Sequence, residues 1–154
     1  MHANINFIGC IRTPYHSLED CPGNIQFGGP QCQLTVDEDY HGELRGLREG
    51  DNILVLYWLG RPKDGVGYTP LTDEAEPGTF AMRTPYRPNP IGAAVVPIES
   101  IEKGKLTVLG LDCLDKTELL DIKPAIFRES VSETDRPGLE GCDCDKLTTC
   151  AGAM

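Results

Sequence analysis

The sequence has no long hydrophobic run, and no segment approaches the roughly 18 consecutive apolar residues that a membrane-spanning helix needs. The first residues, MHANINFIGCIR, lack both the basic region and the apolar stretch of a secretory signal peptide. We therefore expect a cytoplasmic protein with reduced thiols and no membrane partner. The 7 cysteines are an odd number, so they cannot all be paired within one chain.

Basic residues are also scarce, with 14 Lys and Arg against 24 Asp and Glu and a net charge of −10. A surface of this sign repels polyanions at long range, which argues against nonspecific binding to nucleic acid. The acidity is uneven along the chain. Residues 81–128 are the near-neutral part, because acidic and basic side chains are almost equal in number there.

The sequence contains no internal repeat, no glycine-rich nucleotide fingerprint and no segment with the period of an amphipathic helix. Strand-like segments dominate instead, which predicts an all-β fold: a small, closed or nearly closed antiparallel β-barrel with long loops and at most short helices. The expected strands cover residues 5–12, 31–36, 52–60, 93–101, 105–114 and 118–123, and residues 43–49 are expected to form one or two helical turns.

Two of these segments carry further predictions. The run NILVLYWLG (52–60) is continuously apolar, so we expect it to be the central buried strand. Residues 102–105 indicate a hairpin turn, and Pro97 indicates a bulge or an edge strand.

The length of 154 residues suits one domain, which we place at residues 1–128, followed by an acidic tail at residues 129–154. The tail holds Cys142, Cys144 and Cys150. This spacing indicates either a soft-metal or redox site or incidental thiols at a terminus, and it fits no standard zinc finger. We assign no metal ligand.

The stretch MRTPYRPNPIG (82–92) stands directly before an apolar strand. Its prolines fix the backbone before any ligand arrives, which lowers the entropic cost of binding. Arg83 and Arg87 on such a frame can clamp a carboxylate or a phosphate, Asn89 can donate and accept, and Gly92 allows a close approach. The alternative is a rigid barrel corner whose arginines pair with the acidic surface.

A second cluster of polar residues occupies LDCLDKTELLDIKP (111–124), which holds Asp112, Asp115 and Asp121 together with Thr117 and Lys123. Residues 115–117 are typical of a turn between two strands, and in a barrel this turn can stand beside the arginine loop. Its carboxylates then bind an amino group or a ribose hydroxyl pair, or they pair with the two arginines. Asp121 and Lys123 are two apart and therefore share a face of their strand.

These two stretches, with IGCIRTPY near the start, resemble the TrmO/TsaA-like family of S-adenosylmethionine-dependent methyltransferases, whose pattern includes R-P-N-P-I-G and D-G-T-P-V-L-D-I-K-P. The resemblance covers roughly residues 5–128. It implies a small β-barrel, a homodimer with the cofactor near the subunit interface, and N6-methylation of threonylcarbamoyl-adenosine at position 37 of certain tRNAs.

The resemblance also implies site residues. For S-adenosyl-L-methionine they are Pro22, Gly23, Leu59, Gly60, Arg61, Arg83, Arg87, Gly92, Ala93, Leu114, Asp115 and Thr117. Methyl transfer needs mainly alignment of nucleophile, methyl and sulfur, with a base where the nucleophile carries a proton. The catalytic candidates are Asp115, Asp121 and Asn89.

The chain departs from the family pattern near the expected substrate side. Met82 and Thr84 flank the first arginine, Lys116 replaces a glycine, Glu118 replaces a proline and Ala125 replaces a tyrosine. Three functions therefore stay open: a tRNA N6-methyltransferase, a methyltransferase acting on a small molecule or metabolite, and a non-enzymatic protein that binds a nucleoside cofactor or a metal.

Overall fold

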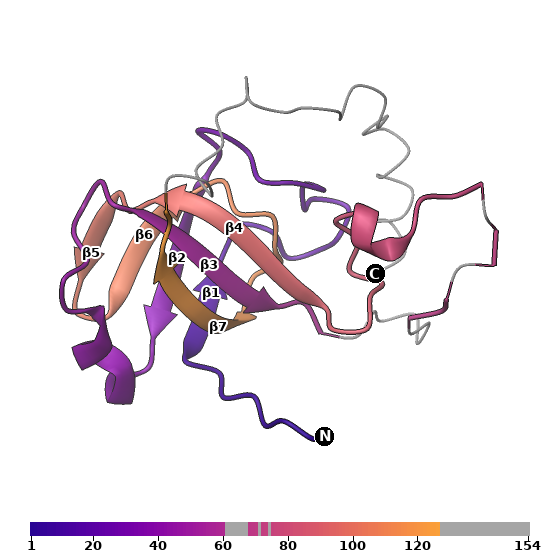
Figure 1. Ribbon diagram of the computed structural model, residues 1–154. Coiled ribbons are helices and arrows are strands. Elements are labelled where there is room, and N and C mark those ends of the chain that lie inside the picture. The colour runs from indigo at the N-terminus through magenta and orange to yellow at the C-terminus, as the bar shows by residue number, and fades with distance from the viewer. Residues whose placement is uncertain (61–67, 71, 74, 127–154) are drawn as a thin grey trace.

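The computed structural model describes residues 1–60, 68–70, 72–73 and 75–126 (Figure 1). The predicted tail at residues 129–154, with its three cysteines, lies outside the described residues, and so does Arg61. Within the described part, no helix is long and apolar enough to cross a membrane. No group of three or more His, Cys, Asp or Glu side chains in that part is arranged to hold a metal ion.

Seven strands form one antiparallel sheet in the order β4-β3-β7-β1-β2-β6-β5 (Figure 1). The strands are β1 (Gly9–Arg12), β2 (Gln31–Val36), β3 (Asn52–Trp58), β4 (Ile91–Pro97), β5 (Ser100–Glu102), β6 (Lys105–Leu109) and β7 (Thr117–Pro124). The described helices are both short 3-10 helices, η1 (Glu38–Leu44) and η2 (Thr79–Ala81). The prediction of an all-β antiparallel fold with long loops and short helices is therefore confirmed.

The sheet curls but does not close, so the predicted barrel is a loose description of it. Its outer strands, β4 and β5, form no ladder with each other in the described part of the chain. They are nevertheless consecutive, because β4 continues through Ile98 and Glu99 directly into β5. The Glu99 amide donates to the Thr107 carbonyl at 2.8 Å, which turns this connection onto β6.

The short helical segment and the first strand differ from the prediction. Helix η1 begins before the predicted helical turns at residues 43–49 and overlaps them only up to Leu44, because Gly46 (φ 101°) and Gly50 (φ 87°) have left-handed backbones that interrupt a helix. Strand β1 begins at Gly9 rather than at residue 5.

The apolar run at residues 52–60 forms β3, but this strand lies second in the sheet and β1 lies in the middle. Burial in β3 alternates, so only Ile53, Val55 and Tyr57 are fully inside. Pro97 ends the edge strand β4, and the predicted hairpin joins β5 to β6; both predictions are confirmed.

The core fills the inner face of the curled sheet. In β2 the alternation predicted from the sequence buries Cys32, Leu34 and Val36 and leaves Gln33 and Thr35 between them on the other face. Tyr57 is the largest fully buried side chain of this core. The arginine loop with η2 extends from the start of β4 away from the sheet (Figure 1).

Candidate functional site

The arginine loop is braced by its own arginines. Arg87 Nη1 donates to the carbonyl oxygens of Met82 at 3.1 Å and Thr84 at 3.3 Å, and the Arg83 guanidinium donates to the carbonyl of Ala93 in β4. The amide of Leu59, after β3, donates to the Pro90 carbonyl at 2.8 Å. Among the described residues, no acidic side chain forms an ion pair with either arginine. The predicted stiffness therefore comes from hydrogen bonds to carbonyl groups as well as from proline.

Tyr57 connects this loop to the second polar cluster. Its ring is 1% exposed, and its hydroxyl donates to the Asp112 carboxylate. Burial raises the pKa of Tyr57 well above its usual value, the negative charge of Asp112 raises it further, and the positive charge of Arg83 acts in the opposite direction. Asp112 binds the hydroxyl directly, and Arg83 is held on the carbonyl of Ala93, next to the Gly92 that packs against the ring. We call Tyr57, Asp112 and Arg83 the Tyr57 cluster.

Gly92 is required by the ring of Tyr57. The two residues face each other across β3 and β4, and a Cβ at Gly92 would lie 2.1 Å from Tyr57 Cε2. The backbone approach predicted for Gly92 is therefore made by an aromatic side chain of the protein itself. Local sequence signals did not single out Tyr57, although most buried tyrosine hydroxyls form a hydrogen bond with a partner.

The predicted contact residues near the N-terminus follow Cys21, whose thiol is influenced by Asp112 of the Tyr57 cluster. Burial raises the pKa of Cys21 to about 12, and the nearby charge of Asp112 adds to this shift. The predicted contact residues Pro22 and Gly23 follow directly in the chain and are half-buried and exposed, respectively. Gly60, at the end of the segment after β3, has a left-handed backbone with φ 74°.

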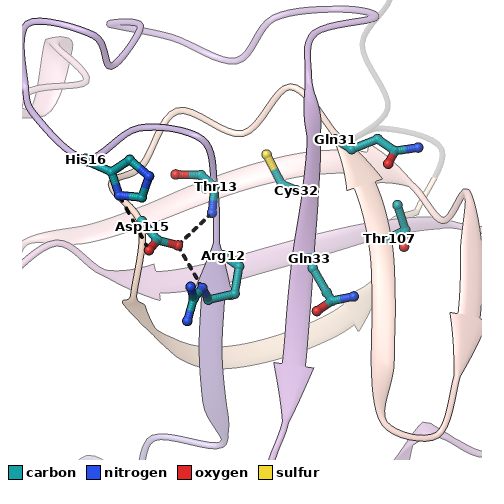
Figure 2. Close-up of a pocket in the computed structure, with 8 residues that line it drawn as sticks. All are labelled: Arg12, Thr13, His16, Gln31, Cys32, Gln33, Thr107 and Asp115. Atoms are coloured by element: carbon teal, nitrogen blue, oxygen red, sulfur yellow. Dashed lines mark hydrogen bonds and ion pairs between the residues drawn. The ribbon is translucent and has the colours of Figure 1, made fainter.

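Asp115 forms its contacts with the end of β1 and not with the Tyr57 cluster. Its carboxylate is 7% exposed and accepts from Arg12 Nε at 2.9 Å and from the Thr13 amide at 3.1 Å, with His16 Nδ1 at 3.7 Å (Figure 2). The predicted turn is present, since the Thr117 hydroxyl donates to the Leu114 carbonyl at 2.7 Å. These contacts occupy the Asp115 carboxylate and fix its position at the end of β1.

The remaining catalytic candidates lie apart from these groups. Asp121 is in β7 and pairs with Lys123 Nζ at 2.6 Å, as expected for two residues on one face, and this hydrogen bond raises the pKa of Lys123. Asn89 is exposed near the end of the arginine loop, and its carbonyl accepts from the Ile91 amide at 2.8 Å. The predicted residues therefore lie in three places rather than one: the arginine loop with the Tyr57 cluster, the Asp115 turn, and the Asp121–Lys123 pair on β7.

A polar pocket of about 370 Å³ lies beside the Asp115 turn (Figure 2). Its lining comes from β1, β2 and β6 as well as from the turn: Arg12, Thr13, His16, Gln31, Cys32, Gln33, Thr107 and Asp115. Sequence reasoning missed this pocket. Arg12, Thr13 and Asp115 lie in the motifs that carry the resemblance, but the other lining residues come from β2, β6 and the segment after β1 and lie outside those motifs.

Fold and site together define an all-β protein with charged groups gathered on loops at one end of a curled sheet. A family model of the tRNA-methyltransferase O N-terminal domain matches residues 10–129. This chain belongs to that family, as the resemblance predicted.

Two relatives of this chain carry names that mention the cofactor or the acceptor. A probable S-adenosyl-L-methionine-binding protein, VirR of Rhizobium radiobacter, is 42% identical over 123 residues, which cover 79% of this chain and 70% of VirR. The tRNA (adenine(37)-N6)-methyltransferase of Escherichia coli is 30% identical over 140 residues and 82% of this chain.

A crystal structure of TrmO from Pseudomonas aeruginosa superimposes with a TM-score of 0.68 at 27% identity and covers 91% of this chain. The match spans 63% of that TrmO chain and 59% of the Escherichia coli enzyme. The shared fold therefore includes nearly all of this chain but only part of those proteins.

Proposed function

We propose that this chain transfers a methyl group from S-adenosyl-L-methionine to N6 of the adenosine at position 37 of a tRNA, with threonylcarbamoyl-adenosine as the modified base. The class of enzyme and the cofactor follow from the family: the chain is an S-adenosyl-L-methionine-dependent methyltransferase. The acceptor rests on the Escherichia coli relative, which is named for adenine 37 of tRNA.

The Tyr57 cluster carries the proposal, because its charges match the amino-acid part of the cofactor. Arg83 can bind the cofactor carboxylate, and Asp112, oriented by the Tyr57 hydroxyl, can bind the amino group. Tyr57 of β3 holds Asp112, and the Ala93 carbonyl of β4 holds Arg83, so little order is lost on binding. When bound, the cofactor supplies an electrophilic methyl group on its sulfonium.

The other predicted cofactor contacts stay part of the proposal. Pro22, Gly23, Leu59, Gly60 and Arg61 would line the cofactor from two loops, Arg87 would hold the arginine loop in shape, and Gly92, Ala93, Leu114, Asp115 and Thr117 would fix the adjacent backbone. Of the catalytic candidates, Asn89 is the exposed one and suits contact with the acceptor. Asp121 and Asp115 would need to exchange their present partners to accept a proton.

Calorimetric titration with S-adenosylhomocysteine tests the cofactor site. We expect micromolar binding to the wild type, loss of binding in Arg83→Ala and Asp112→Asn, and unchanged binding in Arg45→Ala, an exposed arginine beside η1. The absence of binding to the wild type would refute the proposal. Equal weakening in all three variants would show that the Tyr57 cluster is not the site.

A small-molecule acceptor is the second candidate, and the net charge of −10 favours it. Phosphate contacts make RNA affinity fall steeply with salt, whereas binding of a neutral metabolite changes little. Methyl transfer to tRNA that weakens strongly with rising salt supports the first candidate; no transfer to tRNA at any salt concentration supports the second. We propose in addition a cytoplasmic homodimer, which fits a tRNA acceptor and the family resemblance.

A further inference from the structure

We infer that the pocket between Arg12, Gln33 and Asp115 is a recognition site for a neutral nucleobase, which adjoins the proposed cofactor site at Asp115. This inference rests on the proposed function, since it describes where part of the acceptor binds. One loop joins the two sites: Asp112 at its start faces Tyr57, and Asp115 at its end faces the pocket. An acceptor whose reactive atom lies near the Tyr57 cluster can therefore extend across this loop into the pocket.

The lining determines the chemistry of the ligand. Arg12 and Asp115 are its two formally charged residues, and they are paired with each other at 2.9 Å (Figure 2). Their charges cancel, so the pocket favours a neutral ligand over a phosphate or a carboxylate. Gln31 and Gln33 each add an amide that can donate and accept, and Thr107 adds a hydroxyl.

The geometry points to a flat ligand with several hydrogen-bonding groups. Arg12, Gln33 and Thr107 lie opposite one another on β1, β2 and β6, and therefore form one row across the sheet. Because the Asp115 carboxylate holds Arg12 through Nε, the terminal nitrogens of the guanidinium keep free donor directions in a fixed plane. Fixed guanidinium and amide groups are the side chains that read base edges. A volume of about 370 Å³ also lies within the range of roughly 300–1,000 Å³ of small-ligand sites.

The test compares Gln33→Leu and Thr107→Val with a matched control, Thr35→Val. Thr35 is two residues beyond Gln33 on the same face of β2 but does not line the pocket. Each full-length variant is checked for unchanged urea stability and for S-adenosylhomocysteine affinity. The probes are an anticodon stem-loop RNA with adenosine at position 37, the same RNA made abasic at either neighbouring nucleotide, and free nucleosides.

We expect Gln33→Leu to weaken RNA binding roughly tenfold, in line with the loss of one base-edge contact, and to leave the cofactor affinity unchanged. One of the abasic RNAs should bind the wild type about as weakly as the unmodified RNA binds Gln33→Leu. The substitution Gln33→Leu should not lower the affinity for that abasic RNA any further. If free nucleosides bind and respond to Gln33→Leu while RNA does not, the nucleobase site stands and the acceptor is a small molecule.

Wild-type affinity for every probe in Gln33→Leu and Thr107→Val would overturn the inference, and so would equal losses in Thr35→Val. The two proposals fail separately. If the wild type does not bind S-adenosylhomocysteine, the proposed function is refuted. If it binds S-adenosylhomocysteine but the pocket substitutions leave RNA and nucleoside affinity unchanged, only the nucleobase site is refuted.

Discussion

Replacing Gly92 with alanine tests whether this position is reserved for the ring of Tyr57 or for a ligand. An ideal Cβ there lies 2.1, 2.5 and 2.7 Å from three atoms of the Tyr57 ring, all well under the 3.0 Å below which real Cβ contacts essentially never occur. The ring cannot move away easily, because it is 1% exposed and its hydroxyl is bound to Asp112. Either the ring leaves its position or β3 and β4 separate.

Overpacking of a tight core costs about 1–3 kcal/mol, and the rigidity of this site places Gly92→Ala near 3 kcal/mol. That loss corresponds to a decrease in Tm of roughly 6–12 °C for a chain of this size. Urea unfolding followed by the fluorescence of Trp58, the single tryptophan, reports directly on β3. Gly42→Ala is the control, because nothing lies within 4 Å of its Cβ position.

The same substitution in a Tyr57→Leu background separates the two explanations. With the ring gone, Gly92→Ala should cost less than about 1 kcal/mol, which leaves a coupling energy of about 2 kcal/mol between the two sites. Equal losses of stability in both backgrounds would refute the steric argument. A fully stable Gly92→Ala that no longer binds S-adenosylhomocysteine would show that the space belongs to the ligand.

Three further predictions use the same unfolding measurement. Tyr57→Phe removes the hydroxyl that donates to Asp112 and should cost about 1.5–3 kcal/mol, while a change below 0.5 kcal/mol would mean that water replaces the bond. Lys116→Gly should stabilise the protein by about 0.5–1 kcal/mol, because Lys116 has a left-handed backbone with φ 67°, and any loss of stability would contradict this. Burial, then the charge of Asp112, raises the pKa of the Cys113 thiol above its usual 9.0, so the folded state keeps this proton longer than the unfolded state. The stabilisation that this thiol contributes is fully present below about pH 9, and above that pH it falls by up to about 1.4 kcal/mol per pH unit. Cys113→Ala should therefore make Tm decline less steeply between about pH 9 and 10.5. An unchanged slope would exclude the thiol as the source of the decline.

Local patterns in the sequence were sufficient to predict the strands and turns that depend on neighbouring residues alone. The alternation in residues 31–36 predicted β2 with its observed ends, and the Gly-containing turn before Lys105 predicted the β5–β6 hairpin. Even the departure at Lys116 was informative, because the family's glycine marks a left-handed backbone that this chain retains without one.

The site could not be predicted to the same depth because its contacts are distant in the sequence. Tyr57 and its partner Asp112 are 55 residues apart, and Thr13 and Asp115 are 102 apart. In the sequence Tyr57 looks like any other residue of an apolar strand, and nothing indicates which group packs against Gly92. Only the register between β3 and β4 brings them opposite each other.

The position of β7 has a consequence for how the chain is made. β7 is the last strand of the described part, yet it lies between β3 and β1, so it joins the β4-β3 pair to the β1-β2-β6-β5 group. Until residues 117–124 leave the ribosome, these two parts of the sheet share no strand pairing, and the apolar edges of β1 and β3 stay open. A nascent chain of this protein therefore depends on β7 to protect both edges, and stalling before residue 117 would release two unprotected half-sheets rather than a smaller stable domain.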